Sequence, residues 1–510
     1  MVRRGFPARY PSGSGVADKM THAGRWAAIG VAALAATLAV PAGGAAGDPA
    51  PVTKRVAVVL INFSDDTSRP FSAAQAYRAV FTDLDSPAAY FREVSGGALR
   101  LTGRVFGWIR IGFTEKSCSA RTALESARNW NAAARARLAA AGVDIGRFDF
   151  VLYGMSSVSC GAAGRAWVVC SGGRCDRMAF VYYPAAFLGH RAATHELGHL
   201  LGSAHADGYA CTDRKGRRVA IGPTCSSVKY GDPFVIMGSG HGEYDAYRRA
   251  SLGWLAPAEV RTVTRDGVYA VAPIEVPGRV RALKIPRDRD ATGAVTTYYW
   301  LELRRPIGFD GFLAGFSAAR LDGLQIRVAP GEEKSGESSY LIDTTPDTTG
   351  ERDQPLAPGR TLYDAARAVL IENLGVVNGS LRVRVRLALP ADATPPPRPA
   401  RVWDGPGAHD GDRAGTVAQN ELYLSWSRVR DSPGGSGLAG YEYCIGTRVS
   451  ARGCAGTIVG PWQAVTDSPA NFITGPIPLH SGRRYFGCVR ARDNAGNLSG
   501  PRCSDGQVRY

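Results

Sequence analysis

The stretch HELGHLLGSAH, residues 195–205, holds three of the eight histidines in the chain. His195 and His199 are four positions apart, so on a helix they lie on one face about one turn apart. Imidazoles at that separation can reach one Zn²⁺ ion at about 2.0–2.1 Å. Gly202 tolerates the left-handed turn that ends a helix, after which the chain can fold back and deliver His205. Three neutral nitrogens and an open fourth position predict a catalytic zinc site.

Glu196, next to the first histidine, supplies a carboxylate at the predicted metal site. Zinc lowers the pKa of a bound water to around 7, and a neighbouring carboxylate can take the proton as the water attacks a carbonyl. The same carboxylate can then pass the proton to the leaving amine. The sequence therefore predicts hydrolysis of peptide bonds, with Glu196 as the general base.

The motif resembles the HExxHxxGxxH signature of metzincin metalloproteases, whose second mark is a methionine in a turn below the metal. YGDPFVIMGSG, residues 230–240, supplies Met237. With YDAYRRASLGWL, residues 244–255, the pattern is similar to gametolysin-type secreted peptidases over about residues 52–256. The resemblance implies an α+β catalytic domain, with a mixed sheet and an active-site helix.

On this resemblance, the zinc ligands are His195, His199 and His205, and Met237 is the turn methionine. Asp207 follows the third histidine by two positions. We take it as a candidate for orienting the His205 ring, because the second nitrogen of a metal-bound histidine commonly bonds a carboxylate.

The order of patterns along the chain predicts three folded domains. RVAVVLINF, residues 55–63, is typical of a buried strand, and the segment around the histidines has helical spacing. ALRLTGRVFGWIRI, residues 98–111, alternates like a hairpin or a pair of strands. Short strand-like runs separated by Gly, Pro and Asp fill the rest of the chain. The predicted parts are a signal peptide over 1–46, a catalytic domain over 48–256, an all-β sandwich-like domain over 257–392, a proline-rich linker over 393–400 and a second all-β sandwich-like domain over 401–510.

The C-terminal stretch resembles a fibronectin type III domain. Trp426 lies in an early strand-like run, and Tyr485 occupies the place of the corner tyrosine. DNAGN, residues 493–497, would suit Ca²⁺, but Asp, Asn and Gly are also ordinary turn formers, and we expect a turn. Zinc is therefore the one cofactor that the motifs support, and Ca²⁺ is a possibility without support of its own.

The charge and cysteine content of the chain indicate which compartment it works in and which classes of partner it does not bind. The net charge is +16, but the basic residues are scattered, without the dense basic run and interleaved aromatics of a nucleic-acid protein. An apolar run over 26–40 follows basic residues and precedes small ones, which predicts a signal peptide cleaved near Ala46. No later stretch is long and apolar enough for a membrane span. Ten cysteines suit an oxidising compartment, and the local pairs Cys211–Cys225 and Cys444–Cys454 are the simplest expectations.

Two readings of function follow. The first is a secreted zinc endopeptidase that acts on a polypeptide, such as a matrix or cell-surface protein. The alternative is a secreted adhesion or carbohydrate-binding protein with a protease-like fold. The presence of Glu196 beside all three histidines favours the enzyme.

The secreted form should begin near residue 47 and need no further trimming, because only a few residues separate the expected cleavage site from the first strand. N-terminal sequencing of the secreted protein tests this expectation. A mature start well beyond residue 60 would contradict it.

Overall fold

The computed structural model describes residues 51–171, 173–331, 337–348, 352–388, 392–404, 415–416, 422–433, 435–465, 472–474 and 477–510. The predicted signal peptide, 1–46, lies outside these ranges. In the described ranges, no helix has the length and apolar character needed to cross a membrane.

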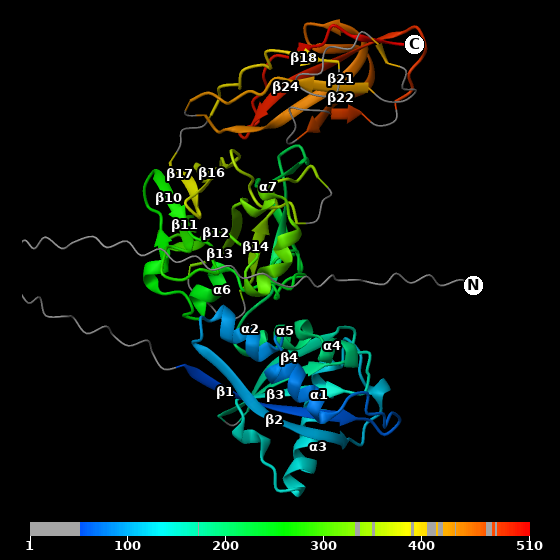
Figure 1. Cartoon of the computed structure of the whole chain (residues 1–510), viewed down its shortest axis with the longest axis vertical. Coiled ribbons are helices and arrows are strands. Elements are labelled where there is room, and N and C mark those ends of the chain that lie inside the picture. The colour runs from blue at the N-terminus through cyan, green and yellow to red at the C-terminus, as the bar shows by residue number, and fades with distance from the viewer. Residues whose placement is uncertain are drawn as a thin grey trace, which may run out of the picture. The chain divides into compact units, whose positions relative to one another are not determined.

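A mixed five-stranded sheet forms the core of the N-terminal region (Figure 1). Its strand order is β2-β1-β3-β5-β4. The first four strands in this order run parallel, and β4, at the edge, is antiparallel to β5. The strands are β1 (Val52–Asn62), β2 (Leu99–Arg110), β3 (Phe150–Met155), β4 (Gly164–Ser171) and β5 (Arg174–Val181). The predicted mixed sheet is confirmed.

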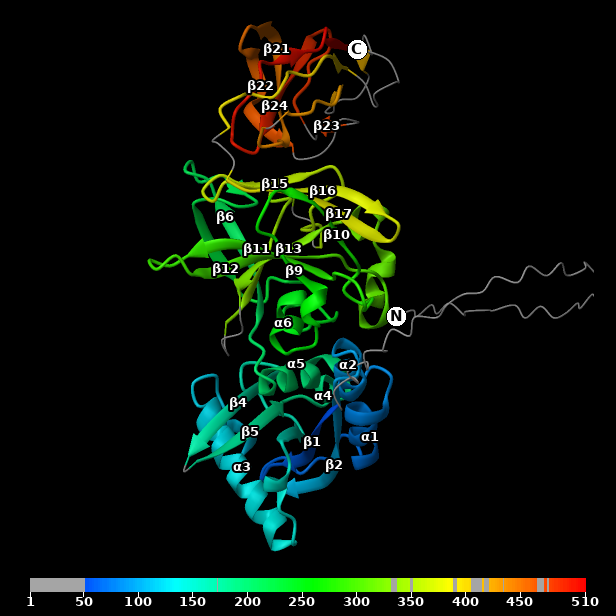
Figure 2. The same cartoon turned by 90° about the vertical axis from the view of Figure 1, so that its left-hand side faces the viewer.

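Helices cover both faces of this sheet, and so the buried part of the inner strand β1 is a continuous apolar run (Figure 2). Residues 56–61 of β1 are fully buried. Val56, Val58 and Leu60 face a core shared with α2 and α5, whereas Ala57, Val59 and Ile61 face a core shared with α3. Because side chains alternate along a strand, a strand covered on both faces reads as a continuous hydrophobic run. The helical elements are α1 (Ala73–Tyr77), η1 (Arg78–Thr82), α2 (Pro87–Val94), η2 (Glu115–Ser117), α3 (Ala123–Ala140), η3 (Ile145–Arg147), α4 (Pro184–Leu188), α5 (His190–Leu200) and α6 (Ala246–Ser251).

The segment 98–111 differs from its prediction as a hairpin or a pair of strands. It forms the single strand β2, which runs parallel to β1. Gly103 lets β2 approach β1 closely and does not form a turn. An added Cβ at this position would lie 1.9 Å from the carbonyl oxygen of Val56.

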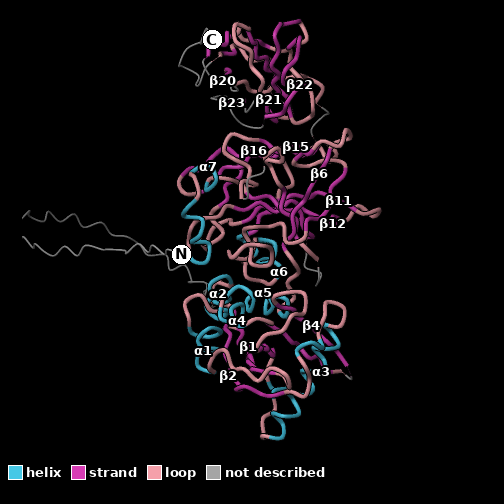
Figure 3. Tube along the Cα trace, turned by 90° about the vertical axis from the view of Figure 1, so that its right-hand side faces the viewer, coloured by secondary structure: helices cyan, strands magenta, loops and turns pink. Residues whose placement is uncertain are grey.

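The middle region is a sandwich of two sheets, and Figure 3 shows that it is nearly all strand and loop. One sheet has the order β10-β17-β16-β15, and the other runs β7-β6-β14-β13-β12-β11-β9, with β8 paired to β6. Apolar side chains from both sheets form one core. The elements are β6 (Ala206–Thr212), β7 (Arg218–Val219), β8 (Thr224–Val228), η4 (Pro257–Glu259), β9 (Val260–Thr262), β10 (Gly267–Val271), β11 (Ala282–Arg289), β12 (Val295–Glu302), η5 (Gly308–Gly315), α7 (Ala318–Leu321), β13 (Gln325–Pro330), β14 (Ser339–Ile342), β15 (Thr361–Asp364), β16 (Val369–Val377) and β17 (Ser380–Arg386).

Strand β6 joins the two regions. It begins directly after His205, inside the range predicted for the catalytic domain, yet it pairs in parallel with β14 of the middle region. The register places Ser339 opposite Ala206 and Tyr340 opposite Asp207. The two regions therefore share a sheet at the point where the histidine motif ends.

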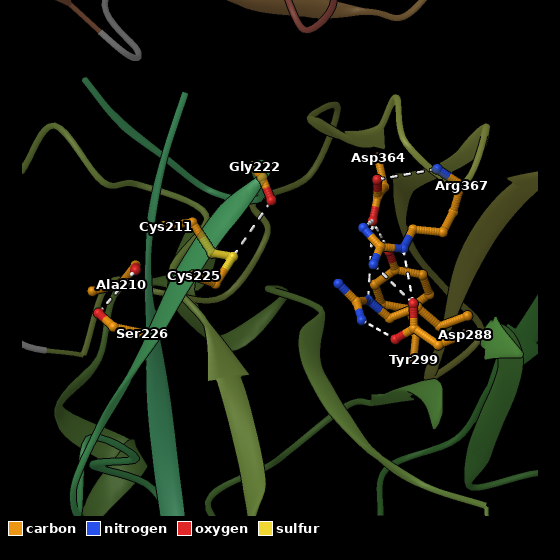
Figure 4. Close-up of a disulfide and its surroundings, with 10 residues drawn as sticks. Ala210, Cys211, Gly222, Cys225, Ser226, Asp288, Tyr299, Asp364 and Arg367 are labelled. Atoms are coloured by element: carbon orange, nitrogen blue, oxygen red, sulfur yellow. Dashed lines mark hydrogen bonds and ion pairs between the residues drawn. A yellow bond between two sulfur atoms is a disulfide. The ribbon is translucent and has the colours of Figure 1, made fainter. Parts of the chain in front are cut away.

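Disulfides close within the two cysteine sets expected from the sequence. Cys211–Cys225 and Cys444–Cys454 are confirmed as local pairs. The first of these links β6 to β8, beside the hydrogen bond from the Ser226 hydroxyl to the carbonyl of Ala210 (Figure 4). The remaining bonds are Cys118–Cys160, Cys170–Cys175 and Cys488–Cys503. Five disulfides are typical of a protein exported to an oxidising space.

The C-terminal region, 401–510, is all-β and has its own core between two sheets. Trp426 and Tyr485 are fully buried in this core. The Tyr485 hydroxyl accepts a hydrogen bond of 2.7 Å from the backbone N–H of His480, as the corner tyrosine of such domains does. The strands are β18 (Val402–Trp403), β19 (Gly415–Thr416), β20 (Leu422–Trp426), β21 (Leu438–Ser450), β22 (Gly453–Val465), β23 (Phe472–Thr474), β24 (Arg484–Asp493), β25 (Arg502–Cys503) and β26 (Gln507–Arg509).

Candidate metal centre

The three histidines of the motif lie together at the end of α5. Their ligand atoms fall within 4.8 Å of one another, which makes them a candidate metal-binding group. The Nε2 atoms of His195 and His199 are 3.1 Å apart. The ring of His205 lies 5.4 Å from that of His195 and 4.8 Å from that of His199, centroid to centroid. One ion could thus contact all three imidazoles.

Backbone carbonyls fix the orientation of the first two rings. The Nδ1 atom of His195 lies 2.8 Å from the carbonyl oxygen of Ile236, and that of His199 lies 2.7 Å from the carbonyl oxygen of Ser203. A carbonyl only accepts, so each Nδ1 carries the proton and each Nε2 keeps its lone pair for a metal.

Burial keeps these imidazoles uncharged. It lowers the pKa of His195 to about 3 and that of His199 to about 4, and it also lowers the pKa of His205. A metal binds the neutral imidazole, so the site needs no loss of protons from its histidines at neutral pH.

The loop after α5 brings the third histidine back to the first two. Gly202 has a φ of +102°, a left-handed conformation that glycine adopts without a Cβ penalty. The N–H of Ala206 then donates to the carbonyl of Met237 at 2.9 Å. The predicted break at Gly202 is therefore present, and it turns the chain toward the Met237 turn.

Met237 is fully buried and packs against α5 at Gly198, between His195 and His199. An added Cβ at Gly198 would lie 2.7 Å from its sulfur, so only a glycine lets the helix approach this closely. Arg191 of α5 donates to the carbonyls of Gly240, at 3.0 Å, and Gly238, at 2.8 Å. These contacts hold the turn beneath the histidines, where it supplies the Ile236 carbonyl to His195.

Glu196 is buried beneath the edge strand β4. An added Cβ at Gly164 would lie 2.8 Å from both Cγ and Oε1 of Glu196. Among the described residues, the Oε2 atom is buried and has no hydrogen-bond partner. Burial raises the pKa of Glu196 to about 8, and the charge of Arg165 opposes that rise. Within the described residues, Oε2 of this carboxyl group is therefore free to bond a water.

Tyr230 belongs to the site and was missed by sequence reasoning. Its ring lies 4.3 Å from that of His205 and 6.0 Å from that of His195, and its backbone has a φ of 57°. Burial, reinforced by the charge of Glu196, raises the pKa of Tyr230, so the phenol stays protonated. The available signal was the segment YGDP, residues 230–233, whose turn-forming residues precede the methionine turn.

Asp207 contacts the loop that carries Tyr230. Its carboxylate accepts hydrogen bonds from the N–H of Tyr230, at 2.9 Å, and from the hydroxyl of Ser227, at 3.2 Å. Its charge also acts on His205, where it opposes the fall in pKa that burial causes. Its predicted role in orienting His205 stays a prediction, and its hydrogen bonds support the loop that carries Tyr230.

The DNAGN segment forms the expected turn. Asp493 accepts the N–H of Asn497 with one carboxylate oxygen and its side-chain amide with the other, both at 2.8 Å. Its carboxylate lies within 4.8 Å of those of Asp392 and Asp431. Both of its oxygens therefore accept hydrogen bonds within the turn.

Zinc fits the donor set of the histidine site. Three neutral imidazoles with fixed tautomers are ligands that zinc prefers, and three protein ligands leave a position open. His195, His199 and His205 would hold the ion.

Comparisons with known proteins find structural likenesses over part of the chain. No protein-family model and no curated protein matches the sequence. A titin module from human cardiac muscle aligns at 19% identity over 23% of this chain and 90% of the module, with a TM-score of 0.15. An Fn3-like protein from Clostridium thermocellum aligns at 16% identity over 22% of this chain and 94% of its own, with a TM-score of 0.14. TM-scores this low do not establish a shared fold, so the two-sheet architecture of the C-terminal region is known from its own strands. The metzincin resemblance stays a prediction.

Replacing Gly164 by alanine should displace the Glu196 carboxylate, because the added methyl would overlap it. If Glu196 is the base, Gly164→Ala should lower kcat for peptide cleavage by about tenfold or more, since small displacements of a catalytic group can cost up to about 10²-fold. Zinc content should not change. Gly107→Ala is the matched control, because an added Cβ there meets nothing within 4 Å. Equal activity of both variants would argue against this placement of Glu196.

Proposed function

We propose that the chain is a secreted zinc-dependent endopeptidase. The observation that carries the proposal is the convergence of three neutral histidines. Glu196 directly follows the first of them in the chain and is buried, with an Oε2 that has no hydrogen-bond partner among the described residues. The five disulfides agree with a protein that works outside the cell. Burying a polar oxygen without a hydrogen-bond partner costs stability, and catalysis gives a reason for keeping it that adhesion does not.

The residues of the site divide the work of hydrolysis. When bound, zinc supplies Lewis acidity, which acidifies a water and polarises the scissile carbonyl. Glu196 takes the proton from the attacking water at Oε2 and passes it to the nitrogen of the leaving amine. The Ile236 and Ser203 carbonyls hold His195 and His199 still throughout.

Strand β4 offers a place for the substrate backbone. It lies at the edge of its sheet, paired with β5 alone, and it passes directly over Glu196. An extended peptide can add to an exposed sheet edge through main-chain hydrogen bonds, with side-chain pockets giving specificity. We therefore expect an unfolded or extended polypeptide segment as the substrate.

The secreted protein should bind one zinc ion and cleave casein, and a chelator should abolish cleavage until zinc is restored. Glu196→Gln should lower kcat by about 10²- to 10⁴-fold, the usual contribution of a general base. Its zinc content should stay unchanged, because the three histidines remain.

Glu125→Gln provides the control, since Glu125 is exposed on α3. Cleavage that persists in Glu196→Gln, or that ignores the chelator, would show that the proposed function is wrong. Metal analysis of the same preparations separates loss of zinc from loss of the base.

We propose that the Tyr230 hydroxyl donates a hydrogen bond as the scissile carbonyl acquires negative charge. Its phenol is protonated and lies over the ring of His205. Tyr230→Phe keeps the ring and removes the donor, so kcat should fall by about 10²-fold, the usual effect of losing one such donor. Tyr183→Phe, another partly exposed tyrosine, is the control. An unchanged kcat in Tyr230→Phe would exclude this role.

A further inference from the structure

The backbone on both sides of His205 is held by groups that connect to the middle β region. Downstream, β6 pairs with β14 from its first residue, so Ala206 lies opposite Ser339. Upstream, the carbonyl of Ala204 accepts two hydrogen bonds from Arg248 of α6, at 2.9 Å from Nη2 and 3.3 Å from Nε. The third candidate ligand is thus fixed between these two attachments.

Arg248 links the His205 loop to β14. Its side chain is buried, it forms an ion pair with Asp245, and its Nη1 donates to the Ser339 hydroxyl at 2.7 Å. The Ser339 hydroxyl donates in turn to Asp245 at 3.2 Å. One guanidinium therefore contacts the residue before His205 and the residue opposite Ala206.

Arg327 makes the corresponding link to the methionine turn. It lies on β13, is 1% exposed, and its Nε donates to the carboxylate of Asp232 at 2.7 Å. Its Nη1 donates to Glu302 of β12 at 2.7 Å. Asp232 accepts the N–H of Phe234 through its side chain and that of Ser239 through its carbonyl, both at 2.9 Å, and so it spans the turn that carries Met237.

Stability alone is a weak reason for burying these charges. A buried ion pair can commonly be replaced by apolar side chains without loss of stability, because desolvation offsets the Coulomb attraction. Such pairs do fix geometry, because a planar guanidinium that donates to several groups at once sets both the distances and the directions of those hydrogen bonds. Here the fixed points are a carbonyl next to His205 and a carboxylate within the Met237 turn.

We propose that the middle β region is an integral part of the metal centre, with Arg327 and Arg248 as positioning residues that hold His205 and the Met237 turn at the geometry of a zinc site. The inference rests on the proposed metal centre. Partners that orient the ligands of a metal typically change its affinity by about 10- to 100-fold when they are lost. The zinc affinity of the three histidines should therefore depend on residues from β13 and β14 that touch none of them.

Arg327→Lys tests this dependence in the full-length protein, because lysine keeps the positive charge and loses the planar fork. Arg287→Lys is the matched control. Arg287 has a side chain that is 9% exposed and is paired with Asp288 and Asp364 in the middle region, and it lies over the ring of Tyr299. The measurements are zinc affinity by competition with a chromophoric chelator, the visible spectrum of the Co²⁺-loaded protein and the Tm of the metal-free protein.

Arg327→Lys should bind zinc about 10- to 100-fold more weakly than wild type and show an altered Co²⁺ spectrum. Arg287→Lys should keep the wild-type affinity and spectrum at a comparable Tm. Wild-type affinity in Arg327→Lys would overturn the proposal, as would weakening to the same extent in both variants. If wild type itself binds no zinc, the proposed function fails instead, so the two failures are distinct.

If Arg327→Lys does not fold, Ser339→Ala is the second variant that tests the same proposal. It removes only the hydroxyl between Arg248 and Asp245, and it should weaken zinc binding several-fold. Ser504→Ala, which removes a buried hydroxyl from the C-terminal region, should leave zinc binding unchanged. An unchanged zinc affinity in Ser339→Ala would overturn the proposal in that case.

Discussion

The hydrogen bonds from the Nδ1 atoms of His195 and His199 to backbone carbonyls are the interactions on which the site depends. A buried imidazole can offer a lone pair to a metal only when it is neutral and when its other nitrogen has a partner. The partners are the carbonyls of Ile236 and Ser203, from two separate segments. The turn around Met237 and the loop after α5 must therefore both be in place before the two rings can face one ion.

Much of this arrangement could be predicted from the sequence, because it depends on local spacing. The continuous apolar run of β1 follows from burial on both faces, and the four-residue spacing of the histidines follows from one helical turn. The glycine that ends α5 has the positive φ that its position requires. Residues 195, 196, 199, 205 and 237 accordingly lie close together, and the two local cysteine pairs are formed.

The parts that escaped prediction depend on contacts between distant segments. Gly103 suggests a turn in sequence, whereas it permits close approach to β1. Asp232 and Arg327 look like surface residues, yet each is almost completely buried because the other neutralises it. The pairing of β6 with β14 leaves no periodic signal, because strand partners more than a hundred residues apart are chosen by the whole fold. Tyr230 joins the site for the same reason, through a loop whose path Asp207 sets.

The sheet shared by β6 and β14 bears on how such a chain can be inherited. A module that passes intact between genes must keep its hydrogen-bonded edges within its own boundaries, or the recipient exposes an unpaired strand that invites aggregation. A gene boundary near residue 256 would separate β6 from its partner strand β14. We therefore expect the N-terminal and middle regions to be inherited together as one unit. Among the described strands, the proline-rich stretch before the C-terminal region separates no two partners of one sheet, so we expect recombination between genes to occur there.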